Sequence, residues 1–370
     1  MTKKSSTTLL YVGTYTKKEG HVDGKAEGIY ILEMNNQTGE LTPLDTILNM
    51  VNPSYLTVHP NGNALYAVNE LAGNGNPPLG TVHAFSLTEN GQLAKALNTV
   101  SAQGDAPCYI SMDQSGKYVL VASYMGTVAA LPIQADGSLG EASSSIKHHL
   151  DNPPGGRQDA AHPHMLRPGI DEKSVFAVDL GMGAIIHYQF EEGQLNPVAK
   201  TELTQGAGSR HLDFHPTKKW AYVLNELNNT VEAFSYTNTA TPFERLQIIS
   251  ALDQPITEGS IGSSAIHMHP SGQFLYAANR GLEGNTTQTI ALFKIDQTSG
   301  KLTLVTTQDT KGFVPRDFAI SPDGQFLLVA NQDSNSIVTF RINQSTGVLE
   351  ETGISQEVKT PVCLKFVEKE

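Results

Sequence analysis

Cysteine is nearly absent from this chain. Its 370 residues include two, Cys108 and Cys363, too few for the disulfide framework of a secreted protein. The start, from Met1 to Thr8, is polar and lacks the apolar core and small-residue cleavage site of a signal peptide. No apolar run approaches the roughly 18 residues that cross a bilayer. We therefore expect a cytoplasmic protein that does not enter a membrane.

Basic side chains are in the minority. Asp and Glu together number 37 against 25 Lys and Arg, and the formal net charge is −12 at pH 7. A chain this acidic is a poor candidate for binding nucleic acid or an anionic membrane surface. A local cluster of Arg could still bind a small anion.

The signatures of several metal, cofactor and nucleophile sites are also lacking. The chain has no CxxC, HExxH or Asp-rich calcium loop, no GxSxG elbow, and no Gly-rich strand-to-helix turn for a nucleotide. His162 and His164 are two residues apart, but Pro163 between them stiffens the link, and no further ligand motif accompanies them. We predict no metal and no cofactor.

The chain does contain a sequence repeat of about 50 residues, which occurs seven times. Each copy begins at a small or Pro anchor, runs through an apolar strand, turns, and returns on a second strand that often ends in Asn. This period predicts an all-β, seven-bladed β-propeller forming a single domain over residues 1–370. The anchors are Pro53, Pro107, Pro163, Ser209, Ser263, Pro315 and Pro361.

The two ends of the chain are complementary. Leu9 to Gly13 and Gly28 to Glu33 have the pattern of a second and a third strand, whereas Val362 to Val367 is a first strand without a partner. Placed together, the N- and C-terminal strands would complete the last blade. The ring would then close and leave no sheet edge open.

Two kinds of recurrent residue are expected to be structural. Repetition at the turn between the first two strands indicates a structural role for His59, His215 and His269. Four asparagines recur where the second strand leaves the sheet, and we expect their side chains to cap backbone groups there. They are Asn69, Asn225, Asn279 and Asn331.

The positions one and 17 residues after each anchor should lie at the same end of a hairpin and face one mouth of the central channel. Ligand sites favour such concave mouths. Three Arg, two Glu and one His there must either bind a ligand or neutralise one another to hold the blades in register. The pairs are Ser54 with Glu70, Cys108 with Tyr124, His164 with Leu180, Arg210 with Glu226, Ser264 with Arg280, Arg316 with Gln332, and Val362 with Thr14.

Two further features concern this mouth. The irregular loop from Pro153 to Asp159 is either a lid, with Arg157 or Gln158 reaching the ligand, or a variable surface connection. Cys108 has no obvious base beside it in its own repeat, which favours a small buried filler over a nucleophile.

The chain resembles the seven-bladed β-propeller lactonase family, which contains bacterial propeller-type 6-phosphogluconolactonases and fungal carboxy-cis,cis-muconate lactonizing enzymes. The resemblance extends from Tyr11 to Phe366, and Ser209 stands where relatives commonly have Pro. The motifs are His162-Pro163-His164, Gly208-Ser209-Arg210-His211, Asn225-Glu226 and Asn279-Arg280. The resemblance implies a site of His164 (with His162 as its rival), Arg210, Glu226 and Arg280. Candidate substrate-binding residues around it are His162, Arg316, Glu70, Arg157 and Gln158.

The activity implied is hydrolysis of 6-phosphoglucono-δ-lactone to 6-phosphogluconate, a step of the pentose phosphate pathway. Such hydrolysis needs a base to activate water and cationic donors for the oxyanion. Either Glu226 or His164 could take the proton. Arg210 and Arg280 would hold the carbonyl oxygen and the phosphate through forked hydrogen bonds.

Other functions fit the same residues. A muconate-type cycloisomerase could use the Arg pair to bind carboxylates. A non-catalytic scaffold is a third possibility, although aromatic residues are only 7% of the chain and fall mostly within strands. We expect a small anionic sugar lactone as the partner, and a monomer or small homo-oligomer.

Overall fold

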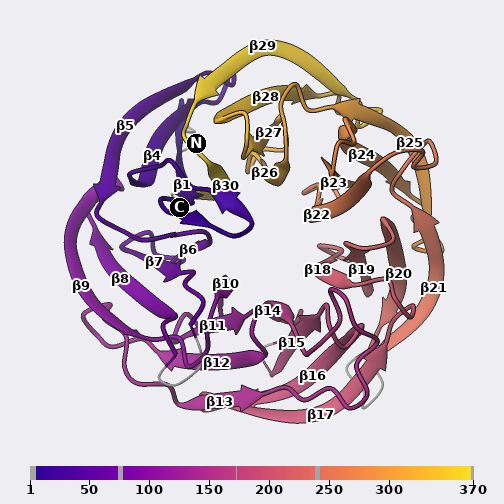
Figure 1. Ribbon diagram of the computed structural model, residues 1–370. Helices are drawn as coiled ribbons and strands as arrows, with labels where there is room; N and C mark the ends of the chain where they lie inside the picture. Colours follow the sequence, from indigo (N-terminus) through magenta and orange to yellow (C-terminus); the bar gives the residue numbers. More distant parts are fainter. Residues whose placement is uncertain (1–5, 74–77, 172, 238–241, 368–370) are drawn as a thin grey trace.

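Seven four-stranded antiparallel sheets are arranged as blades around a central channel (Figure 1). This computed structural model describes residues 6–73, 78–171, 173–237 and 242–367. Every element in these ranges is a strand, and none is a helix that could cross a membrane. The predicted all-β, seven-bladed propeller is confirmed.

Each blade is a meander whose first strand lies nearest the axis (Figure 1). The first strands are β6 (Leu56–Val58), β10 (Pro107–Met112), β14 (Pro163–Pro168), β18 (Ser209–Phe214), β22 (Ser260–Met268), β26 (Pro315–Ile320) and β30 (Pro361–Val367). The second strands are β7 (Ala64–Asn69), β11 (Tyr118–Ser123), β15 (Ser174–Asp179), β19 (Trp220–Asn225), β23 (Phe274–Leu282), β27 (Phe326–Asn331) and β1 (Thr7–Thr14). The third strands are β8 (Thr81–Leu87), β12 (Thr127–Pro132), β16 (Ala184–Glu191), β20 (Thr230–Tyr236), β24 (Gln288–Ile295), β28 (Ser336–Ile342) and β4 (Gly28–Asn35). The outermost strands are β9 (Leu93–Ser101), β13 (Ser144–Lys147), β17 (Gln194–Glu202), β21 (Phe243–Ser250), β25 (Leu302–Asp309), β29 (Leu349–Glu357) and β5 (Leu41–Leu48).

The ring closes through the two ends of the chain. Strand β30 pairs antiparallel with β1, with Leu364 opposite Val12, and the sheet continues through β4 to β5. The N- and C-terminal segments lie side by side in Figure 1. The predicted closure of the last blade is confirmed.

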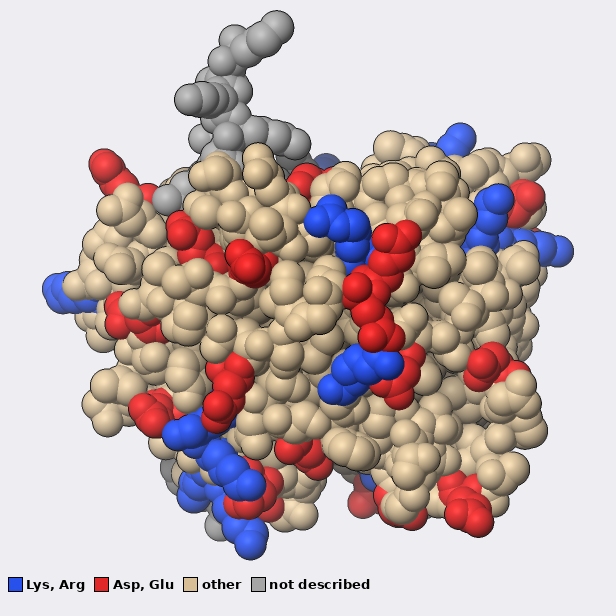
Figure 2. Space-filling model, turned by 90° about the horizontal axis from the view of Figure 1, so that it is seen from above, with Lys and Arg blue, Asp and Glu red and all other residues tan. Residues whose placement is uncertain are grey.

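Burial is greatest in the second strands and least in the outermost strands. Every residue of the second strands β15 and β27 is buried, because these strands are covered by a neighbouring blade on each side. Their sequences are therefore apolar at nearly every position. The outermost strand β29 alternates between exposed and half-buried residues along most of its length. The hydrophobic core thus lies between the blades. On the outer face drawn in Figure 2, acidic and basic side chains are interspersed.

A tyrosine on the second strand links each of four blades to the next. Its hydroxyl donates a hydrogen bond to the carbonyl of the glycine that opens the Gly-x-Leu turn of the following blade. The bonds are Tyr66 to Gly137 (2.9 Å), Tyr222 to Gly300 (3.0 Å), Tyr276 to Gly347 (2.6 Å) and Tyr11 to Gly91.

The turn histidines also link neighbouring blades. Nε2 of His215 lies 2.9 Å from the carbonyl oxygen of Gly272, and its Nδ1 accepts the N–H of Lys218 at 3.0 Å. Since a carbonyl can only accept, this ring is neutral with its proton on Nε2. His59 and His269 make the same contact with Gly116 and Gly324, at 3.1 and 3.0 Å. These bonds support the structural role predicted for the three residues.

The recurrent asparagines behave less uniformly. Asn279 and Asn331 donate to the backbone carbonyls of Ala251 and Thr310, at 2.9 and 3.1 Å, as predicted. Asn225 instead donates to the side chains of Thr230 and Glu232. The prediction was wrong for Asn225 because the Glu232 carboxylate reaches the preceding blade in its place and accepts the N–H of Thr204.

Candidate active site

A β-bulge directs the residue after most anchors toward the channel. The pairing of the first and second strands skips this residue, so it has no opposite partner, and a bulge of this kind re-aims a side chain. The skipped residues are Cys108, His164, Arg210, Arg316 and Val362.

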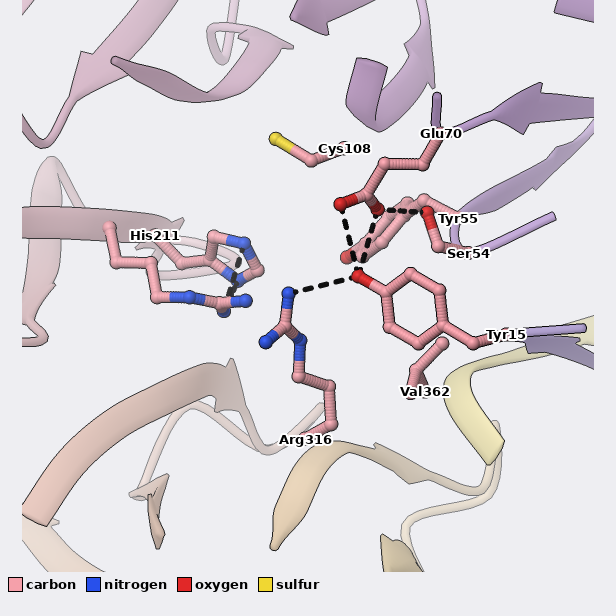
Figure 3. Close-up of a pocket in the computed structure, with 9 residues that line it drawn as sticks. Tyr15, Ser54, Tyr55, Glu70, Cys108, His211, Arg316 and Val362 are labelled. Atoms are coloured by element: carbon pink, nitrogen blue, oxygen red, sulfur yellow. Dashed lines mark hydrogen bonds between the residues drawn. The ribbon is translucent and has the colours of Figure 1, made fainter. Parts of the chain in front are cut away.

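Side chains from several blades line one cavity at this end of the channel (Figure 3). The empty space among them, including its opening to solvent, is about 250 Å³. Six residues predicted to face the mouth meet here: Ser54, Glu70, Cys108, Arg210, Arg316 and Val362. The lining is completed by Tyr15, Tyr55 and His211.

Tyr55 and His211 were not predicted as channel residues. Each stands two positions after its anchor, where simple alternation would point it away, but the bulge after Ser209 lets Arg210 and His211 both face the axis. The rings of Tyr55 and Tyr109 are 4.4 Å apart, and that of His211 is 5.4 Å from Tyr109. Tyr55 and Tyr109 come from neighbouring blades, whereas His211 comes from β18, in a blade next to neither, so the contact of His211 with Tyr109 bridges the channel. The sequence did carry a signal for these channel residues, because aromatic residues and His recur two positions after the anchor, at Tyr55, Tyr109 and His211.

Glu226 is surrounded by arginines. Its Oε2 lies 3.3 Å from Nε of Arg210, and its Oε1 lies 3.3 Å from Arg280 and 3.2 Å from Arg157. The Glu226 side chain is only 5% exposed. Burial alone would raise its pKa, but the guanidinium groups of Arg280, Arg210 and Arg157 outweigh burial and lower the pKa to about 2. Glu226 is therefore a firmly charged carboxylate and a weak proton acceptor.

Arg210 and Arg280 are largely held by the protein. Arg280 donates from Nε to the carbonyl of Gly262 at 3.0 Å, and Arg210 donates to the carbonyl of Ser264. Glu226 is their shared counter-ion, and each guanidinium also donates to a backbone carbonyl. Arg316 is different, because its guanidinium has no carboxylate within 4.0 Å among the described residues.

The loop from Pro153 to Asp159 is attached to the mouth by two side chains. The buried amide of Gln158 donates to the backbone carbonyl of Leu180 at 2.8 Å, which fixes the loop to the end of β15. Arg157, half-exposed, donates to the Tyr124 hydroxyl at 3.1 Å and pairs with Glu226. Of these two residues, Arg157 lies over the mouth, and Gln158 holds the loop in place.

The two candidate histidines have separate surroundings. His162 stacks on Tyr124 at 4.3 Å and contacts Asp159 at 2.9 Å. His164 is buried, with its ring 5.3 Å from that of His211 and its Nδ1 3.9 Å from Sγ of Cys108. Burial, together with Arg210, lowers the pKa of His164 well below its usual value. His164 is thus neutral at working pH.

A second carboxylate, Glu70, lies on the other side of the cavity. The Tyr15 hydroxyl is 3.0 Å from each of its oxygens, and the Ser54 hydroxyl donates to Oε2 (Figure 3). Arg316 donates to the Tyr15 hydroxyl at 3.3 Å. Tyr15 could not be predicted from the repeat, because it follows the closing strand β1 and precedes a small hairpin, β2 (Lys18–Glu19) and β3 (Val22–Asp23).

Cys108 has the surroundings of a filler. It is buried, and burial raises the pKa of its thiol far above the usual value. A protonated thiol is a poor nucleophile. Within the described ranges, no group of three or more His, Cys, Asp or Glu is placed to hold a metal ion.

Comparison with known proteins gives consistent matches along the chain. The family described as "Lactonase, 7-bladed beta-propeller" matches residues 9–366. The 6-phosphogluconolactonase of Bacillus subtilis is 36% identical over 358 residues, which cover 96% of this chain and 97% of that protein. The 6-phosphogluconolactonase of Formosa agariphila is 32% identical, covering 92% and 94% of the two chains.

A solved structure agrees over the whole fold. The periplasmic gluconolactonase of Pseudomonas aeruginosa superposes with a TM-score of 0.88 at 31% identity, covering 99% of this chain and 100% of its own.

Proposed function

This chain belongs to the seven-bladed β-propeller lactonase family, and we propose that it hydrolyses 6-phosphoglucono-δ-lactone to 6-phosphogluconate. The observation that carries the proposal is the charge at the channel mouth. Four arginines meet two glutamates there, in a chain whose net charge is −12. A ring that only neutralised itself would not carry this excess of Arg. A phosphorylated sugar lactone supplies the missing anion.

The chemistry of lactone opening suits these groups. The reaction needs a proton acceptor for water and fixed positive donors for the oxyanion, but it does not need a covalent nucleophile. Guanidinium groups stay charged at any working pH and bind carbonyl and phosphate oxygens through paired hydrogen bonds. Arg316, whose guanidinium lacks a carboxylate partner among the described residues, fits the developing oxyanion. Arg157, half-exposed above the mouth, fits the phosphate.

The test follows the disappearance of freshly prepared 6-phosphoglucono-δ-lactone, coupled to the dehydrogenase that oxidises 6-phosphogluconate. We expect the protein to exceed the rate in buffer by several orders of magnitude. Unphosphorylated glucono-δ-lactone is the matched substrate, since a structural relative is a gluconolactonase. Arg157→Ala should raise KM for the phosphorylated lactone about tenfold or more and leave KM for the unphosphorylated one nearly unchanged.

A rate no faster than buffer with either lactone would overturn the proposal. A panel of muconate-type substrates would then test the cycloisomerase alternative. We also propose a cytoplasmic location, supported by two buried cysteines that form no disulfide. Cell fractionation tests that location.

A further inference from the structure

The two carboxylates of the mouth differ in their partners. Glu226 has three guanidinium groups within 3.3 Å. Glu70 has none within ion-pair distance among the described residues, and its oxygens accept hydrogen bonds from two neutral hydroxyls, those of Tyr15 and Ser54. The second carboxylate is therefore held in position without being neutralised by a bound cation.

The position of Glu70 places it beside the open space. It lines the same cavity as Arg210 and Arg316, which come from β18 and β26 across the channel. The Tyr15 hydroxyl stands between Glu70 and Arg316, donating to the carboxylate and accepting from the guanidinium (Figure 3). A carboxylate has about four acceptor positions, and two hydroxyl donors leave room for a water molecule on the cavity side.

The environment also favours proton uptake. Burial raises the pKa of Glu70 above its usual value, while Arg316 and the hydrogen bonds from Ser54 and Tyr15 only partly oppose that rise. A carboxylate with a raised pKa is a stronger base than an ordinary one, whereas the Glu226 pKa of about 2 makes it a much weaker base.

We propose that Glu70 is the proton acceptor of the hydrolysis, and that Arg316 across the cavity holds the carbonyl oxygen of the lactone. The proposal rests on the lactonase function proposed above. It assigns Glu226 a positioning role, because its charge orients Arg210 and Arg280.

A water molecule on the cavity side of Glu70 gives a proton to the carboxylate while its oxygen bonds to the lactone carbonyl carbon. The carbonyl π electrons move to the oxygen beside Arg316. When the carbonyl re-forms, the bond from this carbon to the ring oxygen breaks, and the ring oxygen recovers the proton from Glu70. The product is the open hydroxy acid, and Glu70 is again ionised.

The first test is Glu70→Gln, which keeps the shape and most hydrogen bonds but removes the base. We expect kcat at pH 7 to fall at least about 100-fold, with KM changed less than about threefold, as for loss of a general base. Glu357→Gln, on the exposed outer strand β29, removes one negative charge elsewhere and should match wild type. Thermal unfolding of all three proteins checks that Glu70→Gln is folded.

The pH profile separates a base from a structural residue. The titratable groups that line the cavity with Glu70 are Arg210, Arg316, Tyr15, Tyr55, Cys108 and His211. The arginines, the two phenols and the buried thiol keep their protons at about pH 5–8, and burial holds the pKa of His211 well below its usual value. His21 lies 3.4 Å from the Tyr15 hydroxyl, and burial lowers its pKa to about 4, below that of Glu70. The acid limb of kcat/KM is therefore expected to report Glu70, and to vanish in Glu70→Gln.

Ser54→Ala supplies an independent readout. The Ser54 hydrogen bond lowers the pKa of Glu70, so its loss should move the acid limb to higher pH while the base remains. Added formate should raise the hydrolysis rate of Glu70→Ala at least tenfold, and it should have no effect on the rate of wild type.

Activity of Glu70→Gln within fivefold of wild type would overturn the proposal. So would a lost rate with an unchanged acid limb in Glu70→Gln, together with no rescue by formate in Glu70→Ala. In both of these outcomes the wild-type protein still hydrolyses the lactone, so only the role of Glu70 is overturned. If the wild-type protein hydrolyses the lactone no faster than buffer does, the proposed function fails and the role of Glu70 fails with it.

Discussion

At the scale of single residues, the charge of Glu226 organises its half of the mouth. The carboxylate is buried and contacts Arg210, Arg280 and Arg157, and the Arg280 and Arg210 guanidiniums are themselves buried and tied to backbone carbonyls. Removing such a charge leaves several buried cations without their counter-ion, which destabilises more than the ion pair itself stabilises.

Glu226→Gln is accordingly expected to lower the free energy of unfolding by about 3 kcal/mol or more, and to reduce kcat/KM by misplacing the arginines. Urea unfolding at pH 7 measures the first and the lactone assay the second. Glu202→Gln breaks an exposed pair with Lys200 at 3.2 Å and should change stability by less than about 0.5 kcal/mol. Equal stability of the two variants would contradict the argument.

The convergence of mouth residues could be predicted from the sequence, because a fixed offset from a repeated anchor fixes the end of the hairpin. The pairing within the mouth could not. That Arg280 and Arg210 meet Glu226, while Arg316 meets Tyr15, depends on side-chain conformations across blades. His211 escaped prediction because a one-residue bulge breaks the alternation on which the sequence reading relies.

At the scale of elements, the blades are joined by hydrogen bonds that repeat with the fold. The Tyr222 hydroxyl is buried and donates to the Gly300 carbonyl of the next blade at 3.0 Å. Phe176 occupies the equivalent place, 13 residues after its anchor, so the fold accepts a ring without the hydroxyl there. Removing the hydroxyl at Tyr222 nevertheless leaves the Gly300 carbonyl without this donor.

Tyr222→Phe should therefore lower the free energy of unfolding by about 1–2 kcal/mol, the usual effect of losing one partner of a buried hydrogen bond. Thermal or urea unfolding measures it. Tyr118→Phe is the control, since the Tyr118 hydroxyl donates to no described residue and its ring packs on Phe190. The lactone assay should be unaffected in both. A Tyr222→Phe protein as stable as wild type would show that this link contributes nothing.

Most of the strands could be predicted from the sequence. The terminal strands β1, β4 and β30 were predicted, and they are one to three residues longer than expected. The hairpin of β2 and β3 was not predicted, because two-residue strands carry too few side chains to show a period.

At the scale of the whole molecule, closure of the ring depends on the seven residues of β30. Strand β30 supplies the innermost strand of a blade that otherwise starts at β1, and the N–H of Leu364 donates to the Asp317 carboxylate of the neighbouring blade at 3.1 Å. Without β30 the edge of β1 is unpaired, which exposes a template for association with other chains.

Deleting residues 361–370 should thus abolish cooperative unfolding and produce soluble aggregates or insoluble protein. Size-exclusion chromatography and thermal unfolding measure the two effects. Deleting only residues 368–370, which follow the end of β30 at Val367, is the control and should behave as wild type. A monomeric, cooperatively folded protein lacking residues 361–370 would contradict the role assigned to this strand.

The acid side of the stability profile is also a property of the whole molecule. Burial lowers the pKa of His164, His211, His215 and His187 below the unfolded value of about 6.5, so the native state binds fewer protons than the unfolded chain in this range. Their contribution to stability is complete above about pH 6.5 and is lost as the pH falls from that value through the native pKa values. Glu226, with a pKa of about 2, adds its own loss only below about pH 4.5.

We therefore expect the free energy of unfolding, measured in urea, to fall between pH 7.5 and pH 5. Each proton taken up only by the unfolded chain gives a slope of about 1.4 kcal/mol per pH unit. His211→Gln should reduce this slope by up to that amount, because glutamine stays neutral at every pH. His149→Gln, at an exposed position, should leave the slope unchanged. A free energy of unfolding that stays constant from pH 7.5 to pH 5 would contradict this argument. It would mean that the histidines take up protons in the native state as readily as in the unfolded chain, although His164 and His211 are buried.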